Sequence, residues 1–136
     1  MEAPSAAQTG IRPALDPVQF PFRVAVIVPC YNEGRTIGAV ISDMRSAMPT
    51  ADLYICDNNS TDDTIEQACS AGATVLTESY QGKGNAVRRL FSDVEADVYV
   101  MVDGDATYDA AAAPSMVDRL VAERLAMING ARVSTE

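Results

Sequence analysis

The chain has 136 residues, which is enough for a single domain with an apolar core of its own. Its formal charge of −9 and its pI near 4.3 argue against nucleic acid or an anionic membrane surface as a direct electrostatic partner. The absence of histidine excludes a Ser-His-Asp triad, a Cys-His dyad and ordinary histidine zinc sites. The three cysteines, Cys30, Cys56 and Cys69, are odd in number and widely spaced, which predicts reduced thiols in a cytoplasmic protein.

The N-terminal segment, residues 1–22, is rich in Ala, Pro, Ser and Gln and predicts a flexible leader. It lacks the apolar run of a signal peptide, and no stretch of the chain is long enough to span a bilayer. We therefore expect a cytoplasmic protein, for which a peripheral contact at the inner face of the membrane is the one membrane association left open.

From residue 24 onward, short apolar runs alternate with amphipathic segments. Val24 to Val28 is an uninterrupted apolar run, which is typical of a strand buried on both faces. The next segment carries apolar residues at helical spacing from Ile37 to Ala47, and Pro49 ends it. These two segments predict a strand followed directly by a helix.

The remaining elements follow the same alternation. Ser60 and Asp63 resemble a capping box at the start of a helix that carries Ile65 and Ala68, and Gly72 is a candidate C-cap for it. Further strands are predicted over residues 53–56, 74–77, 98–102 and 126–133, and further helices over 86–91 and 113–125.

Alternating strands and helices with short loops predict right-handed crossovers, and therefore a mostly parallel sheet with helices on both faces. Ligands of such α/β folds bind beyond the carboxyl ends of the strands. Polar clusters follow four of the predicted strands here, at residues 29–33, 57–60, 81–84 and 103–105. Their convergence on one edge of one sheet predicts a ligand site.

Asp103 and Asp105 are the most informative pair, because an apolar run delivers both carboxylates to its carboxyl end with Gly104 between them. Two hard oxygen ligands favour Mg²⁺ or Mn²⁺, which keep positions open for phosphate oxygens. An isolated Asp-x-Asp is also common in an acidic turn that precedes a helix. The convergence of the other clusters favours the metal site.

The motif order Pro-x-Tyr-Asn-Glu, Asp-Asn-Asn-Ser-Thr-Asp, Gly-Lys-Gly and Asp-x-Asp resembles the nucleotide-binding half of family-two inverting glycosyltransferases. Within this family, the chain resembles the dolichyl- and polyprenyl-phosphate sugar synthases. The resemblance runs from about Arg23 to Val133 and implies a Rossmann-like GT-A fold, the nucleotide-diphospho-sugar transferase fold. It implies a domain over residues 23–136 that is the N-terminal, donor-binding portion, apparently truncated.

The resemblance implies a UDP- or GDP-sugar donor and assigns the residues that bind it. Tyr31 would lie against the base, since stacking needs a flat apolar face, although a half-buried residue at a strand end is the alternative. Glu33 would contact the base or ribose, and Asp57 would accept a hydrogen bond from the base, unless it caps a helix. The nucleotide-sugar-binding set is completed by Pro29, Asn32, Asn59, Lys83, Asp103 and Gly104.

Lys83 would meet a phosphate at the start of a helix, where glycines allow close backbone approach. Arg88 would assist it or lie on a solvated helix face. Asp103 and Asp105 would hold the metal ion, which offsets negative charge on the departing diphosphate. The chain departs from many relatives at Asn58, where a second Asp is common, and at Thr107, where Gln is common.

Relatives that glycosylate hydroxyl groups use a general base from a second half that this chain lacks, so no catalytic base is assigned. A lipid phosphate acceptor at the membrane is already an anionic nucleophile and needs no base. The short chain fits a truncated gene product, a deliberately shortened chain or one component of a split protein. A partial sheet would expose one edge strand and apolar surface, which predicts self-association or marginal stability.

Two other functions compete with metal-dependent transfer of a sugar. One is a non-catalytic nucleotide-binding or assembly module that keeps the pocket without transfer. The other is a phosphotransferase with Asp103 as nucleophile, since an Asp-x-Asp after a strand also occurs in haloacid-dehalogenase-like phosphatases. That chemistry needs further acidic and Lys partners in a different order.

Overall fold

The computed structural model describes residues 20–131, and its centre is a four-stranded parallel sheet. The strands lie in the order β3-β2-β1-β4. Their bounds are Val24–Cys30 for β1, Asp52–Asp57 for β2, Thr74–Thr77 for β3 and Val98–Met101 for β4. All three strand pairs are parallel. The predicted strand-helix alternation and parallel sheet are therefore confirmed.

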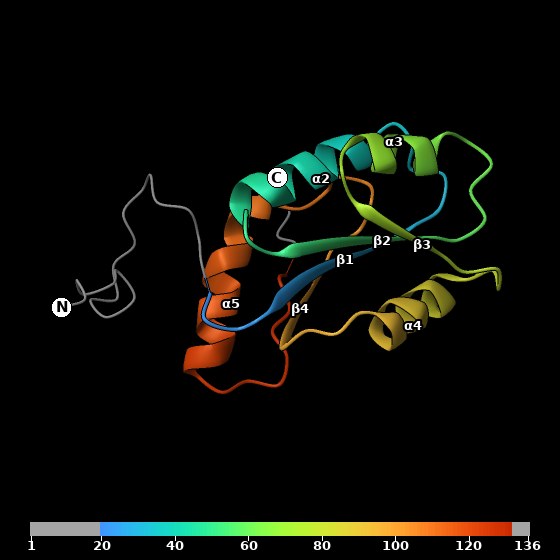
Figure 1. Ribbon diagram of the computed structural model, residues 1–136. Coiled ribbons are helices and arrows are strands. Elements are labelled where there is room, and N and C mark those ends of the chain that lie inside the picture. The colour runs from blue at the N-terminus through green and yellow to red at the C-terminus, as the bar shows by residue number, and fades with distance from the viewer. Residues whose placement is uncertain (1–19, 132–136) are drawn as a thin grey trace.

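Helices cover both faces of the sheet (Figure 1). On one face lie α2 (Ile37–Ala47), α3 (Thr64–Ser70) and α5 (Ala113–Ala122), the last preceded by a 3-10 turn, η1 (Ala110–Ala112). Of the described helices, α4 (Lys83–Asp93) alone covers the other face. Within the described range no helix is long and apolar enough to cross a membrane.

The central strand β1 is buried along its whole length. Because successive side chains of a strand point to opposite faces, its residues divide between two apolar clusters. Val26 and Val28 pack with α2 and α5, whereas Ala25 and Ile27 pack with α4. An uninterrupted apolar run was the sequence signal for this strand, and burial on both faces is its structural reason.

The predicted capping box is wrong. No side chain caps the first turn of α3 from Asp63, and the Ser60 hydroxyl instead accepts the Asn32 N–H at 2.8 Å. Asp62 accepts the Thr64 N–H at 3.0 Å in its place. Gly72, just beyond α3, has φ +88°, a left-handed conformation that suits the predicted glycine at a helix end.

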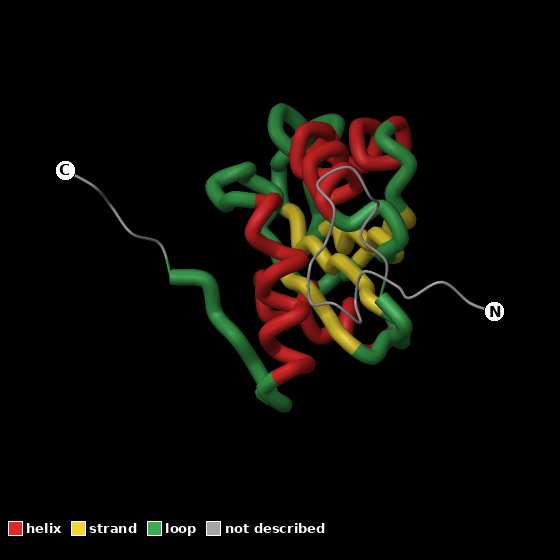
Figure 2. Tube along the Cα trace, turned by 90° about the vertical axis from the view of Figure 1, so that its left-hand side faces the viewer, coloured by secondary structure: helices red, strands yellow, loops and turns green. Residues whose placement is uncertain are grey.

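The C-terminal elements are shorter than predicted. α5 ends at Ala122 rather than Leu125, because Arg124 adopts φ +54° and breaks the helical path. No strand forms over residues 126–131, so the last predicted strand is wrong in its described part, and residues 132 and 133 lie outside the description. Figure 2 shows this segment running away from the packed elements.

Residues 1–19, most of the predicted leader, lie outside the described part of the chain. At its end, Phe20 and Phe22 form a ring pair with centroids 5.3 Å apart and pack against the core. The Arg23 N–H donates to Asp97 at 2.8 Å, and its guanidinium donates to Asp52 at 3.1 Å. Residues 20–22, at the end of the predicted leader, therefore pack with the domain.

Candidate functional site

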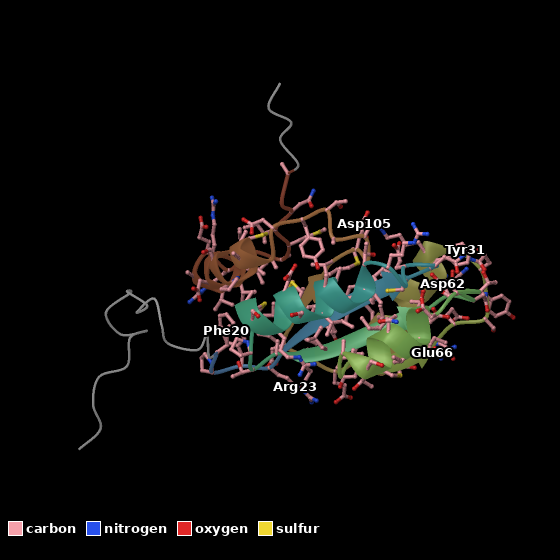
Figure 3. The ribbon with its side chains drawn as sticks, turned by 90° about the horizontal axis from the view of Figure 1, so that it is seen from above. Phe20, Arg23, Tyr31, Asp62, Glu66 and Asp105 are labelled. Atoms are coloured by element: carbon pink, nitrogen blue, oxygen red, sulfur yellow. The ribbon has the colours of Figure 1, made fainter. Side chains whose placement is uncertain are left out.

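The predicted clusters follow the carboxyl ends of the strands, so they share one edge of the sheet. Figure 3 places Tyr31 and Asp62 toward one end of the molecule and Phe20 and Arg23 toward the other, with Asp105 between them. The parallel topology produces this arrangement, because every strand enters the sheet at the same end.

The loop after β1 is fastened to the loop after β2 by Asn32. Its backbone has φ +52°, and its side-chain Oδ1 accepts the Thr61 N–H at 2.8 Å. Asn32 therefore shapes the site by joining two loops. Pro29 is buried within β1, in register with Cys56. Tyr31 has half of its surface exposed, which leaves its ring open to a ligand.

Asp57 lies at the end of β2 with only 3% of its surface exposed. Its Oδ2 accepts the Ser60 N–H at 3.1 Å, whereas its buried Oδ1 has no hydrogen-bond partner among the described residues. Asp57 does not cap α3, whose first N–H goes to Asp62. A buried acceptor without a donor costs free energy, and such an atom fits a site that a ligand completes.

Asn58 is a buried residue beside the site that the sequence marked only as a departure from relatives. It is 2% exposed, and its amide bonds to the loop that precedes Lys83. Asn59 adds to the same loop, with Nδ2 donating to the Ser79 carbonyl at 2.9 Å and to Gln81 Oε1 at 3.1 Å. The available signal was a polar amide immediately after a buried strand, which must find partners inside the fold.

Lys83, the first residue of α4, and Asp103, in the loop after β4, form an ion pair, with Nζ and Oδ1 2.5 Å apart. Both side chains are about half exposed, so the pair is accessible to a ligand. Lys83, which was predicted to bind phosphate, therefore contacts Asp103, which was predicted to bind the metal ion. Arg88 is exposed on α4, in agreement with the solvated-face alternative.

Gly104 is buried against the loop after β1. A Cβ at this position would lie 3.1 Å from both Cys30 Sγ and Glu33 Cγ, so only glycine fits without displacement. The Gly104 carbonyl accepts the Thr36 hydroxyl at 2.5 Å. This close approach brings the Asp-x-Asp segment against Glu33.

Partial burial and the nearby Asp105 and Asp103 carboxylates raise the pKa of Glu33 above its ordinary value. Asp105 Oδ1 accepts the Thr107 hydroxyl at 2.7 Å and the Thr107 N–H at 3.2 Å. Negative charge is therefore concentrated at the end of β4. Across residues 20–131, however, no group of three or more His, Cys, Asp or Glu side chains is arranged to hold a metal ion.

The four-stranded parallel sheet with its helices matches the GT-A fold of solved glycosyltransferases. The chain belongs to Glycosyl transferase family 2, whose profile matches residues 25–136. The sequence-based recognition of the family and fold is confirmed.

Three relatives illustrate the membership. Protein RfbJ from Shigella flexneri is 55% identical over 111 residues, which is 82% of this chain and 86% of RfbJ. Glycosyltransferase AglJ from Haloferax volcanii is 45% identical over 74% of this chain and 33% of AglJ. The dolichyl-phosphate hexose transferase of the same organism is 31% identical over 82% of this chain and 48% of that enzyme.

Solved structures agree with the sequence comparisons. Glucosyl-3-phosphoglycerate synthase from Mycobacterium tuberculosis superposes with a TM-score of 0.62 at 28% identity, over 78% of this chain and 41% of that one. The same synthase in complex with Mn²⁺ and UDP-glucose gives a TM-score of 0.60 at 27% identity, over 78% of this chain and 40% of that one. The chain thus spans most of RfbJ but less than half of the other relatives.

Proposed function

We propose that the chain binds the donor of a glycosyltransferase reaction, a UDP- or GDP-sugar, together with Mg²⁺ or Mn²⁺, and supports transfer of the sugar. The observation that carries this proposal is the contact between Lys83 and Asp103. To bind a diphosphate together with its cation, a site needs a positive side chain and carboxylates that lie within a few ångströms of one another. Family membership and a fold neighbour whose complex contains Mn²⁺ and UDP-glucose support the same conclusion.

The base would bind between the loops after β1 and β2. The unpartnered Oδ1 of Asp57 would accept an N–H from the base, and the half-exposed ring of Tyr31 would stack on its face. Glu33, between these loops and the Asp-x-Asp segment, would contact base or ribose. Asn32 and Asn59 would act on the ligand through the loops that they hold.

A divalent cation would be held by Asp103 and Asp105. Their oxygens are the ligand type that Mg²⁺ and Mn²⁺ prefer, and burial together with the nearby Asp105 and Asp103 carboxylates raises the pKa of Glu33 beside them. The remaining ligands would come from water and the donor diphosphate. When bound, the cation supplies charge that stabilises the departing diphosphate. Lys83 would then leave Asp103 for the same phosphates.

A lipid phosphate is the acceptor that we propose. The dolichyl-phosphate hexose transferase of Haloferax volcanii, which aligns with 82% of this chain, supports that class of acceptor. A phosphate oxygen is already an anionic nucleophile, so the reaction needs no general base from the protein. A cytoplasmic location with peripheral membrane contact would bring the chain to this acceptor.

Calorimetric titration of the purified chain with UDP, GDP and their sugar conjugates, with and without Mn²⁺, tests the proposal. Binding should require Mn²⁺ and should weaken at least about tenfold in Asp105→Ala, because a metal-bridged contact is lost. Glu66→Ala removes the same charge from the exposed surface of α3 and serves as the matched control. It should bind as the unmodified chain does.

Donor hydrolysis or transfer to a polyprenyl phosphate by the same samples distinguishes the two functions of the site. Metal-dependent binding with turnover supports the transferase. Binding without turnover favours the non-catalytic nucleotide-binding or assembly module. A folded chain that binds no nucleotide under any condition would contradict both.

A further inference from the structure

The structure assigns Asn58 a role that family membership does not give it: we infer that it is a positioning residue for the loop over residues 78–83, which we call the diphosphate loop. The inference rests on the proposed function, since it explains how Lys83 is presented to the donor phosphates. Asn58 itself is buried and would not touch the donor.

The Asn58 amide uses its full hydrogen-bonding capacity on this loop. Its Nδ2 donates to the carbonyls of Glu78 at 3.0 Å and Tyr80 at 2.8 Å. Its Oδ1 accepts the Gly82 N–H at 2.7 Å and the Gln81 side-chain amide at 3.3 Å. A primary amide has two donors and two acceptor lone pairs, so all four are satisfied within one short loop.

The backbone of Asn58 anchors this amide to the sheet. Its N–H donates to the Cys30 carbonyl at 2.9 Å, at the end of β1. The Glu78 N–H donates to the Asp57 carbonyl at 3.0 Å, so the loop starts from the neighbouring backbone position. Asn58 therefore fixes the position of the diphosphate loop relative to the two central strands, β1 and β2.

The contact with Gly82 is the step that reaches Lys83. Gly82 has φ +136°, a conformation that side-chain-bearing residues rarely adopt, and it is the N-cap residue of α4. Asn58 Oδ1 holds the N–H of this residue, and Lys83 follows it directly. The direction in which α4 starts, and with it the origin of the Lys83 side chain, depends on this bond.

A second clamp acts on the loop independently of Asn58. The buried Glu78 carboxylate accepts the Tyr80 N–H at 2.9 Å and pairs with Arg89 Nη2 of α4 at 3.2 Å. Hydrogen bonds from these groups lower the pKa of Glu78, so it stays ionised and paired at neutral pH. Arg89 therefore offers a second way to loosen the same loop without touching Asn58.

Asn58→Asp is the sharpest test, because it keeps the size of the side chain and removes its donors. A carboxylate would face the Glu78 and Tyr80 carbonyls, which repel it, while still accepting the Gly82 N–H. The diphosphate loop should shift and carry Lys83 with it. Asn129→Asp makes the same charge change at an exposed C-terminal position and is the matched control.

The measurement is an NMR titration of each variant with UDP and with uridine in saturating Mg²⁺, or with GDP and guanosine if the unmodified chain selects guanine. Asn58→Asp should weaken UDP binding about tenfold and change uridine binding less than about twofold, because the base site does not use Lys83. Asn129→Asp should change neither. Equal losses for UDP and uridine would overturn the inference, since a general structural defect would affect both.

A double-mutant cycle shows whether Asn58 acts through Lys83. Lys83→Met and the double variant Asn58→Asp/Lys83→Met should bind UDP about equally. Once the Lys83 ammonium is removed, moving its loop causes no further loss of affinity. Independent, additive losses would overturn the inference. If circular dichroism shows Asn58→Asp to be unfolded, Arg89→Met carries the test, with the same selective loss of UDP expected. Failure of the unmodified chain to bind any of these ligands would refute the proposed function and this inference with it.

Discussion

At the scale of single residues, the site contains buried polar side chains of two kinds. Some keep an atom that lacks a hydrogen-bond partner within residues 20–131, and others have all of their hydrogen-bonding groups paired. Asp57 and Asn58 are neighbours and both are buried, but Asp57 keeps one oxygen without a donor among the described residues and Asn58 keeps none of its groups idle. An incomplete group is suited to a ligand, and a completed one to holding its surroundings in place.

Asp57→Asn should separate binding from stability. Asparagine can keep the Ser60 N–H bond through its oxygen, and it replaces Oδ1, the buried oxygen that has no donor among the described residues, by an amide nitrogen. The melting temperature should therefore not fall, whereas UDP or GDP affinity should drop about tenfold or more, because a donor now faces the base. Calorimetry of unfolding and of binding on one sample measures both quantities.

Asp52→Asn is the matched control for this prediction, since Asp52 lies at the opposite end of β2 and pairs with Arg23. It changes the same charge on the same strand and should leave nucleotide affinity unaltered. A marked loss of stability in Asp57→Asn, or undiminished nucleotide binding, would show that Asp57 serves the fold and not the ligand.

At the scale of helices and strands, the reactivity of the cysteine thiols depends on how tightly the helices pack on the sheet. Cys30 and Cys56 are buried in β1 and β2, and Cys69 is exposed on α3. Burial raises the pKa of Cys56 to about 11 and that of Cys30 further still, so neither forms the reactive thiolate near neutral pH. All three are free thiols, as the sequence predicted.

A thiol reagent at pH 8 should therefore modify one cysteine per folded chain rapidly and all three after unfolding in guanidinium. Cys69→Ser should remove the rapid reaction and leave the two slow thiols, which react only as the sheet opens. Rapid modification of Cys30 or Cys56 in the folded protein would mean that the layers over β1 and β2 are loosely packed.

The elements were predictable from the sequence because their signals are local. An uninterrupted apolar run marked β1, and helical spacing of apolar residues marked α2. The edge of the sheet on which the clusters meet followed from the parallel topology alone. These inferences need only the order of elements and their periodicity.

The side-chain network could not be predicted, because each partner depends on how the loops lie. Ser60 was expected to cap a helix, but its hydroxyl is taken by Asn32 from another loop. The position of Asn58 after a buried strand indicated that its amide needs partners, but not which groups they are. The positive φ of Arg124 ended α5 although the helical pattern continues to Leu125. Propensity and spacing do not specify such long-range contacts.

At the scale of the whole molecule, the outer edge of β4 is open. Within residues 20–131, β4 pairs only with β1, so its outer edge carries unpaired backbone groups. Beside it, Met101 and Phe91 are each about half exposed, and α4 is the one described helix on its face of the sheet. Open strand edges next to apolar side chains are templates for pairing with another chain.

We expect reversible self-association through β4, opposed by the net charge of −9. In sedimentation velocity, the average mass should rise with protein concentration and rise further with added salt, because salt screens the repulsion while the apolar contact remains. Met101→Lys places a charge at the edge and should restore the monomer. Met127→Lys, at an exposed methionine of the C-terminal segment, makes the same change away from the sheet and should not. A wild-type chain that stays monomeric at every concentration and salt level would mean that the open edge is too short and too acidic to pair.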